Sequence, residues 1–127
     1  MSTSITALIA FTIDCSDASK LARFYADLTG AEVTAEYPEY GYAQTTIGTH
    51  TLNFQGVESY SAPQWPSQRH PQQFHLDFRV GELEAAIERA IGLGATVAGE
   101  QPSPEAYRVL LDPDGHPFCL VPSAHED

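Results

Sequence analysis

The spacing of hydrophobic and polar residues changes along the chain in an order that occurs twice. In AFTIDCSDASKLARFYADLTGAEVT, residues 10–34, an alternating stretch precedes apolar residues at helical spacing, a glycine and a second apolar stretch. The segment HLDFRVGELEAAIERAIGLGATV, residues 75–97, repeats that order. Each segment therefore predicts a strand, an amphipathic helix and a second strand.

Both predicted helices carry signals at their ends. Asp17 or Ser16 is expected to cap the start of the first helix, and Gly30 stands where a C-terminal cap belongs. Gly94 is expected to end the second helix. Its start is weaker, because Gly81 stands where a polar capping residue would be more favourable.

Each half continues with two more strand-like runs joined by a turn. The runs are YAQTTI (42–47) and TLNFQ (51–55) in the first half, and YRVLL (107–111) and PFCLV (117–121) in the second. The second turn is DPDG, in which Asp112 can accept hydrogen bonds from backbone amides and Gly115 tolerates a positive φ. The chain is thus predicted to contain one βαβββ module twice.

The two halves align with a nearly constant offset. Ala10 matches His75 at an offset of 65 residues, and Asn53 matches Cys119 at an offset of 66 because the second turn is longer. We expect a single domain over residues 1–127. It would consist of a first module (1–55), a linker rich in Pro and Ser (56–72) and a second module (73–127).

Composition narrows the classes of function. The chain has 17 acidic and 6 basic residues and a net charge of -11, which argues against binding to nucleic acid or to an anionic membrane. No apolar run has the length of a membrane span, and the first residues lack the basic segment of a signal peptide. With only two cysteines, a cytoplasmic protein without a disulfide scaffold is expected.

Strand alternation predicts an apolar face for the helices to cover and an opposite face lined by small and hydrogen-bonding side chains. A composition of this kind favours a ligand-binding cleft over a sheet face exposed to water. Trp65 in the linker either pins the linker or roofs the cleft. The predicted ligand-binding residues are Ala10, Thr12, Asn53, Gln55, Trp65, His75, Asp77 and Cys119.

Three stretches give the chain a family resemblance: DASKLARFYADLTGAEV, QQFHLDFRV and LDPDGHPFCLV. In this order they resemble the vicinal oxygen chelate superfamily, which includes glyoxalase I, extradiol dioxygenases and bleomycin-resistance proteins. The resemblance implies an α+β fold in which two βαβββ modules form a half-open, mixed, eight-stranded barrel-like sheet around a cleft. It also implies, for the enzymes of the superfamily, a divalent metal bound by one residue from the first and last strand of each module.

Carried over to this chain, the metal-binding positions are Ala10, Asn53, His75 and Cys119, with Gln55 as the alternative to Asn53. Ala10 has no donor atom, and a neutral amide is a poor ligand for a divalent ion. Two donors remain, whereas a catalytic zinc site generally takes three protein ligands. We therefore expect no metal residues and no cofactor, and a divalent metal is disfavoured.

Three classes of function remain. The first is a metal-free protein that sequesters a cationic or aromatic drug or metabolite. The missing metal ligands, the acidic charge and the aromatic residues favour it, although solubility alone is the better explanation of the charge. The second is an enzyme with His75 as general base, Asp77 as its neighbouring acid or orienting group, and Cys119 as nucleophile if His75 lowers its pKa. The third is a metal-dependent lyase, isomerase or dioxygenase. The alternative interpretation of Cys119 is a small, buried and unreactive side chain.

One helix for four strands leaves much of each sheet uncovered. A second copy of the chain could cover it, and two-fold pairs are the commonest closed assembly. A homodimer is therefore expected, and the small members of the superfamily that the chain resembles also commonly pair.

Overall fold

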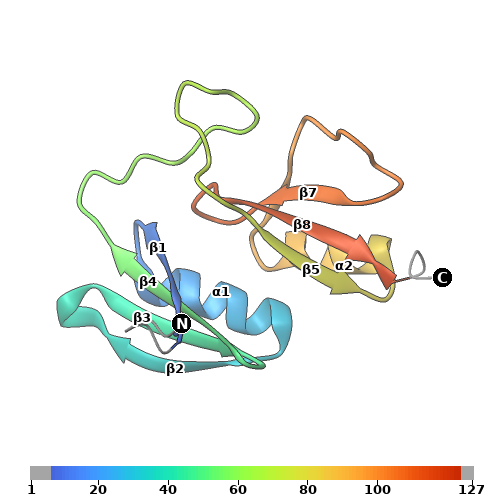
Figure 1. The fold of residues 1–127 in the computed structure, drawn as a ribbon. Helices are drawn as coiled ribbons and strands as arrows, with labels where there is room; N and C mark the ends of the chain where they lie inside the picture. The colour runs from blue at the N-terminus through green and yellow to red at the C-terminus, as the bar shows by residue number, and fades with distance from the viewer. Residues whose placement is uncertain (1–6, 124–127) are drawn as a thin grey trace, which may run out of the picture. The chain divides into compact units, whose positions relative to one another are not determined.

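Two four-stranded sheets, each accompanied by one long helix, make up the computed structural model, which describes residues 7–123 (Figure 1). The boundary between the two compact units falls between Tyr60 and Ser61, inside the predicted linker. From here on, the first and second module are these two units, so most of the predicted linker belongs to the second. In the described part of the chain, no helix combines the length and apolar character needed to cross a membrane.

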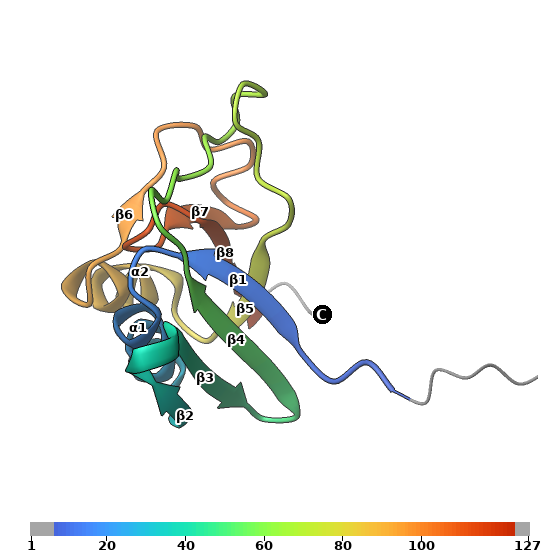
Figure 2. The same cartoon turned by 90° about the vertical axis from the view of Figure 1, so that its left-hand side faces the viewer.

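The first module has the predicted order of elements. They are β1 (Phe11–Cys15), α1 (Ala18–Thr29), β2 (Glu32–Tyr37), a short 3-10 helix η1 (Pro38–Tyr40), β3 (Tyr42–Ile47) and β4 (His50–Gly56). The strand order in the sheet is β1-β4-β3-β2. Strand β1 runs parallel to β4, beside which it lies in Figure 2, and the other two pairs are antiparallel.

The second module repeats this topology. Its elements are β5 (Leu76–Val80), α2 (Leu83–Gly92), β6 (Thr96–Val97), β7 (Arg108–Leu111) and β8 (Pro117–Pro122), in the sheet order β5-β8-β7-β6. Thr12 pairs with Asn53 across β1 and β4, as Asp77 pairs with Cys119 across β5 and β8. The predicted α+β class and βαβββ repeat are confirmed, and so is the alignment of Asn53 with Cys119.

The helix ends follow the sequence signals. The Asp17 side chain accepts a hydrogen bond from the Lys20 amide at 3.1 Å, and Gly30 ends α1 in the left-handed region with φ of 75°. Helix α2 begins after Glu82 with no side-chain hydrogen bond at its cap, as its weak start predicted. It ends at Gly92, two residues before Gly94, whose φ is 119°.

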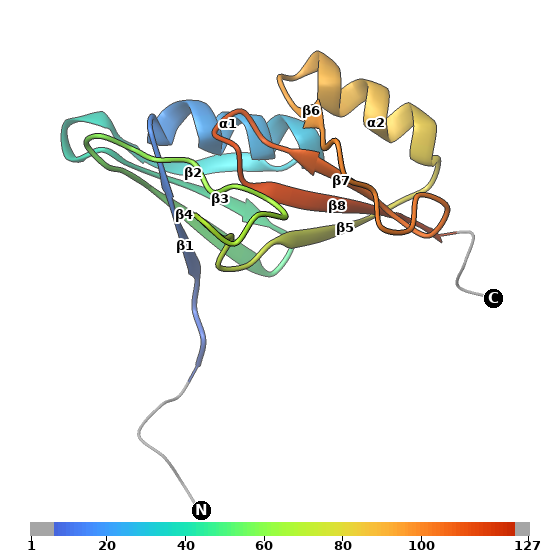
Figure 3. The same ribbon diagram turned by 90° about the horizontal axis from the view of Figure 1, so that it is seen from above.

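One face of each sheet packs against the helix of its module. In the first module the ring of Tyr25 on α1 stacks on Phe54 of β4 at a centroid distance of 5.8 Å. In the second module α2 lies along one face of the sheet, as Figure 3 shows, and β8 contributes the fully buried Phe118 and nearly fully buried Leu120. Burial of these side chains stabilises each module. Because each module has only one long helix among the described residues, the opposite face of its sheet is not covered by a helix of the same module.

The DPDG turn fixes where β8 begins. Asp112 is 4% exposed, and its Oδ1 accepts hydrogen bonds from the amides of Asp114 (2.8 Å) and His116 (3.0 Å). Gly115 has a φ of 91°, and a Cβ there would lie 2.9 Å from the Cβ of Ala62. The turn chemistry predicted from the sequence is confirmed. The turn also packs closely against the start of the linker.

Candidate functional site

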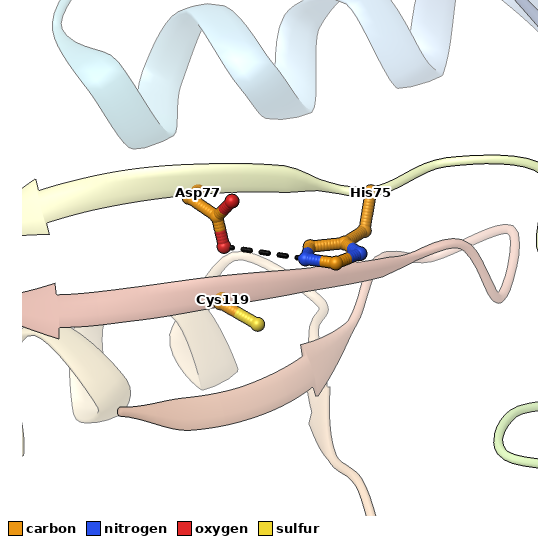
Figure 4. Close-up of side chains that lie close together, drawn as sticks. All are labelled: His75, Asp77 and Cys119. Atoms are coloured by element: carbon orange, nitrogen blue, oxygen red, sulfur yellow. Dashed lines mark ion pairs between the residues drawn. The ribbon is translucent and has the colours of Figure 1, made fainter. Parts of the chain in front are cut away.

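Three side chains with ionisable groups meet on the uncovered face of the second module. His75 directly precedes β5, and Asp77 lies two residues further on, so both side chains point to the same side of the strand. Cys119 on β8 is the cross-strand partner of Asp77. One potential ligand atom of each residue lies within 4.8 Å of the other two (Figure 4).

Asp77 connects the three groups of this cluster. Nε2 of His75 lies 3.3 Å from Oδ1 of Asp77, and the two side chains are 39% and 60% exposed. The Cys119 thiol is hydrogen-bonded to Asp77 and is only 6% exposed. Burial, followed by the negative charge of Asp77 and this hydrogen bond, raises the pKa of Cys119 from 9.0 to about 11.

The raised pKa corrects one expectation about Cys119. A cysteine nucleophile reacts as the thiolate, and its activation requires a lowered pKa. Here the pKa moves in the opposite direction, because burial of the thiol and, after it, the negative charge of Asp77 both disfavour the thiolate. The thiol of Cys119 therefore stays protonated at neutral pH, and His75 does not activate it.

The cluster forms the polar part of a pocket of about 290 Å³ within the second module. The pocket is lined by Trp65, Gln72, His75, Asp77, Tyr107, Val109, Pro117, Cys119 and Val121. Most of these side chains are apolar or aromatic, and few polar groups converge on the space. This combination is typical of sites for small organic ligands.

Trp65 forms one wall of the pocket although it lies in the predicted linker. Its side chain packs, with Tyr107, against the buried group that contains Val109 and Cys119. With the Gln72 amide oriented to suit its neighbours, the amide oxygen accepts a hydrogen bond from the indole N–H at 3.1 Å. Trp65 thus packs against its own module and also lines the pocket, and its role in covering a ligand stays a prediction.

In the first module, the positions on β4 that correspond to Cys119 and its neighbour on the same face carry amides, Asn53 and Gln55. Oδ1 of Asn53 accepts hydrogen bonds from the Tyr42 hydroxyl at 2.8 Å and from Nε2 of Gln44 at 3.0 Å. Nε2 of Gln55 donates to the Gly41 carbonyl at 3.3 Å. The carbonyl oxygen of Asn53, the atom that a metal would need, is thus already engaged by two donors.

Four of the eight predicted ligand-binding residues come together in the second-module pocket: Trp65, His75, Asp77 and Cys119. The remaining four belong to the first module and do not line this pocket; they are Ala10, Thr12, Asn53 and Gln55. Their role in binding stays a prediction. Sequence reasoning missed the other wall residues, which are Gln72, Tyr107, Val109, Pro117 and Val121.

The metal set expected from the family resemblance does not fit this chain. Ala10 supplies no donor atom, and the oxygen of Asn53 is engaged. The sequence left two possible metal donors, His75 and Cys119, and this number was too low. Asp77 lies close to both and is a third potential ligand. A metal at these three residues is chemically feasible, and it would use a different set of ligands.

Comparisons with known proteins agree with the fold. Residues 10–121 match the family model of a glyoxalase-like domain. The fosfomycin resistance protein FosX from Listeria monocytogenes was solved as a mutant with Mn(II) and 1S,2S-dihydroxypropylphosphonic acid. It is 20% identical with a TM-score of 0.69, over 92% of this chain and 90% of that one.

Two further solved structures are similar. A glyoxalase-related enzyme from Fulvimarina pelagi is 18% identical with a TM-score of 0.66, covering 94% of this chain and 90% of the other. A hypothetical protein from S. aureus is 19% identical with a TM-score of 0.68, covering 94% and 99%. A comparison with curated proteins gives no match. At these identities the similar structures establish a shared fold.

Proposed function

Because the chain belongs to the glyoxalase-like domain family of the vicinal oxygen chelate superfamily, we propose that it sequesters a small organic molecule without converting it. The proposed ligand is cationic and partly aromatic, and it binds the pocket of the second module when no metal ion is bound there. The proposal rests on one observation: the aromatic side chains of Trp65 and Tyr107 line the same pocket as a single accessible carboxylate, that of Asp77.

The walls of the pocket suit a flat apolar group. Trp65 and Tyr107 provide aromatic surfaces, and Val109 adds an aliphatic one. The volume of about 290 Å³ lies at the lower end of the range for ligand pockets, so the ligand is small. An indole face also attracts a cation within about 6 Å of the ring centre.

The charge near the pocket favours a cation. The carboxylate of Asp77 is 60% exposed and can accept further hydrogen bonds besides its contacts with His75 and Cys119, because a carboxylate has about four acceptor sites. The net charge of -11 attracts cations to the protein and repels anions. An amine or amidine group beside Asp77 would therefore complete the site.

Binding can be followed through Trp65, which is the only tryptophan of the chain. A screen of aromatic amines and amidines is expected to yield compounds that change its fluorescence. The variant Asp77→Asn keeps the shape of the side chain and removes its charge. We expect it to weaken binding of such a compound by about 1.5 to 3 kcal/mol, the range for a hydrogen bond to a charged group. Isothermal titration calorimetry measures the difference.

The matched control is Glu88→Gln, which removes one negative charge on the exposed side of α2 in the same module. It is expected to leave affinity nearly unchanged. Equal affinity of Asp77→Asn and the unaltered protein would contradict the place given to the cation. Affinity that also persists in His75→Ala would show that the ligand binds elsewhere.

A second candidate function is catalysis with His75 as general base. The contact of 3.3 Å between its Nε2 and Asp77 favours it, because a carboxylate can orient an imidazole for proton transfer. Mass spectrometry of the ligand recovered after incubation separates the two candidates. A chemically altered ligand, absent with His75→Ala, would replace sequestration by an enzymatic function.

We also propose that the protein forms a homodimer. Large hydrophobic side chains of the first module are exposed, among them Phe11 (43%), Tyr37 (50%) and Tyr40 (74%). Exposed apolar surface of this kind is typical of interfaces. Light scattering at micromolar concentration and moderate salt is expected to give twice the 13.8 kDa of one chain. A mass near that of one chain would refute pairing.

A further inference from the structure

The geometry points to a binding site for a zinc-class divalent ion, formed by His75, Asp77 and Cys119 of the second module alone. This inference does not rest on the proposed function, since it concerns an inorganic ion and these three side chains. It also departs from the ligand set that the family resemblance implies, which takes one residue from each of four strands in two modules.

The backbone places the three donors in advance. His75 and Asp77 are separated by one residue on one side of β5, and Cys119 is held opposite Asp77 by the parallel pairing of β5 and β8. One ligand atom of each lies within 4.8 Å of the others. Small side-chain rotations therefore bring all three atoms to bonding distance of one ion, roughly 2.0 to 2.3 Å for zinc.

The kinds of donor atom select the class of ion. An imidazole nitrogen, a carboxylate oxygen and a thiolate sulfur together suit zinc and similar borderline ions, whereas magnesium, calcium and manganese favour oxygen ligands. Neutral His75 with the anions of Asp77 and Cys119 balances two positive charges. The thiolate of Cys119 is the donor that favours a zinc-class ion over magnesium, calcium or manganese, which prefer oxygen ligands.

The cluster is open to an ion that arrives from solvent. The side chains of His75 and Asp77 are 39% and 60% exposed, whereas Cys119 is only 6% exposed. On binding, the S–H bond of Cys119 breaks, the sulfur electron pair forms the bond to the ion, and the proton passes to bulk water. Three protein ligands leave a fourth position of a tetrahedral ion free for water.

The first module adds no ligand to this site. Its residue at the place of His75 is Ala10, and its residue at the place of Cys119 is Asn53, whose oxygen accepts two hydrogen bonds. An ion on Asp77 also neutralises the carboxylate that the organic cation of the proposed function needs. The ion and the organic cation are therefore expected to exclude one another.

Cobalt(II) is a coloured probe for this site. The full chain, freed of metals with a chelator, is titrated with Co²⁺ and followed by absorption. We expect saturation at one ion per chain, visible bands of tetrahedral cobalt, a near-ultraviolet sulfur-to-cobalt band, and loss of all bands on addition of Zn²⁺. Cys119→Ser is expected to abolish the sulfur band. Asp77→Asn is expected to keep it and to weaken binding more than tenfold.

Two controls test the placement. Cys15→Ala removes the buried thiol of the first module, and His116→Gln removes the imidazole of the DPDG turn; both are expected to leave the spectrum unchanged. Circular dichroism confirms that each variant is folded. A titration without a saturable sulfur band, or a band that survives in Cys119→Ser, would overturn the inference. Because no organic ligand is present, either result leaves the proposed function standing.

Discussion

Cys119 is expected to react with iodoacetamide at pH 8 about 100-fold more slowly than a thiol whose pKa is 9.0. Only the thiolate reacts, and a pKa of about 11 lies two units higher, each unit lowering the thiolate fraction about tenfold. The rate is expected to rise with pH until about pH 11. The measurement uses Cys15→Ala in a chelator, so that Cys119 is the only cysteine and no ion is bound.

The variant Asp77→Asn in the same background separates the causes of the raised pKa. Loss of the carboxylate removes the negative charge and its hydrogen bond and so lowers the pKa, whereas burial, the largest cause, remains. Alkylation at pH 8 is expected to become faster and yet stay slower than that of an exposed thiol. Glu88→Gln is expected to change nothing. A rate in Asp77→Asn equal to that of the parent would show that Asp77 does not act on the thiol.

Replacement of Phe118 by Ala is expected to lower the free energy of unfolding by about 3 to 5 kcal/mol, the range for removal of a buried aromatic side chain. Phe118 is fully buried, and its ring packs edge-on against Phe78 at 6.0 Å. Urea denaturation followed by circular dichroism and by Trp65 fluorescence measures the loss.

Phe74→Ala is the matched control, since Phe74 precedes β5 in the same module and is 43% exposed. It should destabilise less, because nearly half of the Phe74 side chain already contacts water in the folded state, whereas Phe118 is fully buried. Equal losses for the two variants would contradict the packing of β8 against α2. Phe118 and Cys119 are adjacent on β8 and face opposite sides of the sheet. Phe118→Ala therefore also shows how much the core stabilises the strand that carries Cys119.

Much of the fold could be predicted because its signals are local. Alternating residues, helical spacing and caps at Asp17 and Gly30 depend only on neighbouring residues, and the repeat then indicated that both modules have the same βαβββ order of elements along the chain. The offset between the halves also predicted that Asn53 matches Cys119, and the structure pairs these two residues with the equivalent residues Thr12 and Asp77. That register makes Asn53, rather than Gln55, the counterpart of Cys119.

The site was harder to predict for two physical reasons. The family resemblance implies only one metal ligand from each strand, so Asp77 was not included among the expected donors. Strand alternation nevertheless places Asp77 on the same side of β5 as His75. The pocket walls also depend on where the linker returns to its module. Neither the packing of Trp65 beside Tyr107 nor the contact of Gln72 with the indole has a local signal, because a Pro- and Ser-rich segment has no periodic pattern.

The equal register of the two sheets creates redundancy that natural selection can use. Each cross-strand position occurs twice in one gene, so a mutation at one copy leaves the other unaltered. The pair Thr12 and Asn53 is electrically neutral, whereas Asp77 and Cys119 carry a carboxylate and a thiol at the same positions of the repeated backbone. Substitutions can therefore add or remove functional side chains in one module without changing the side chains of the other.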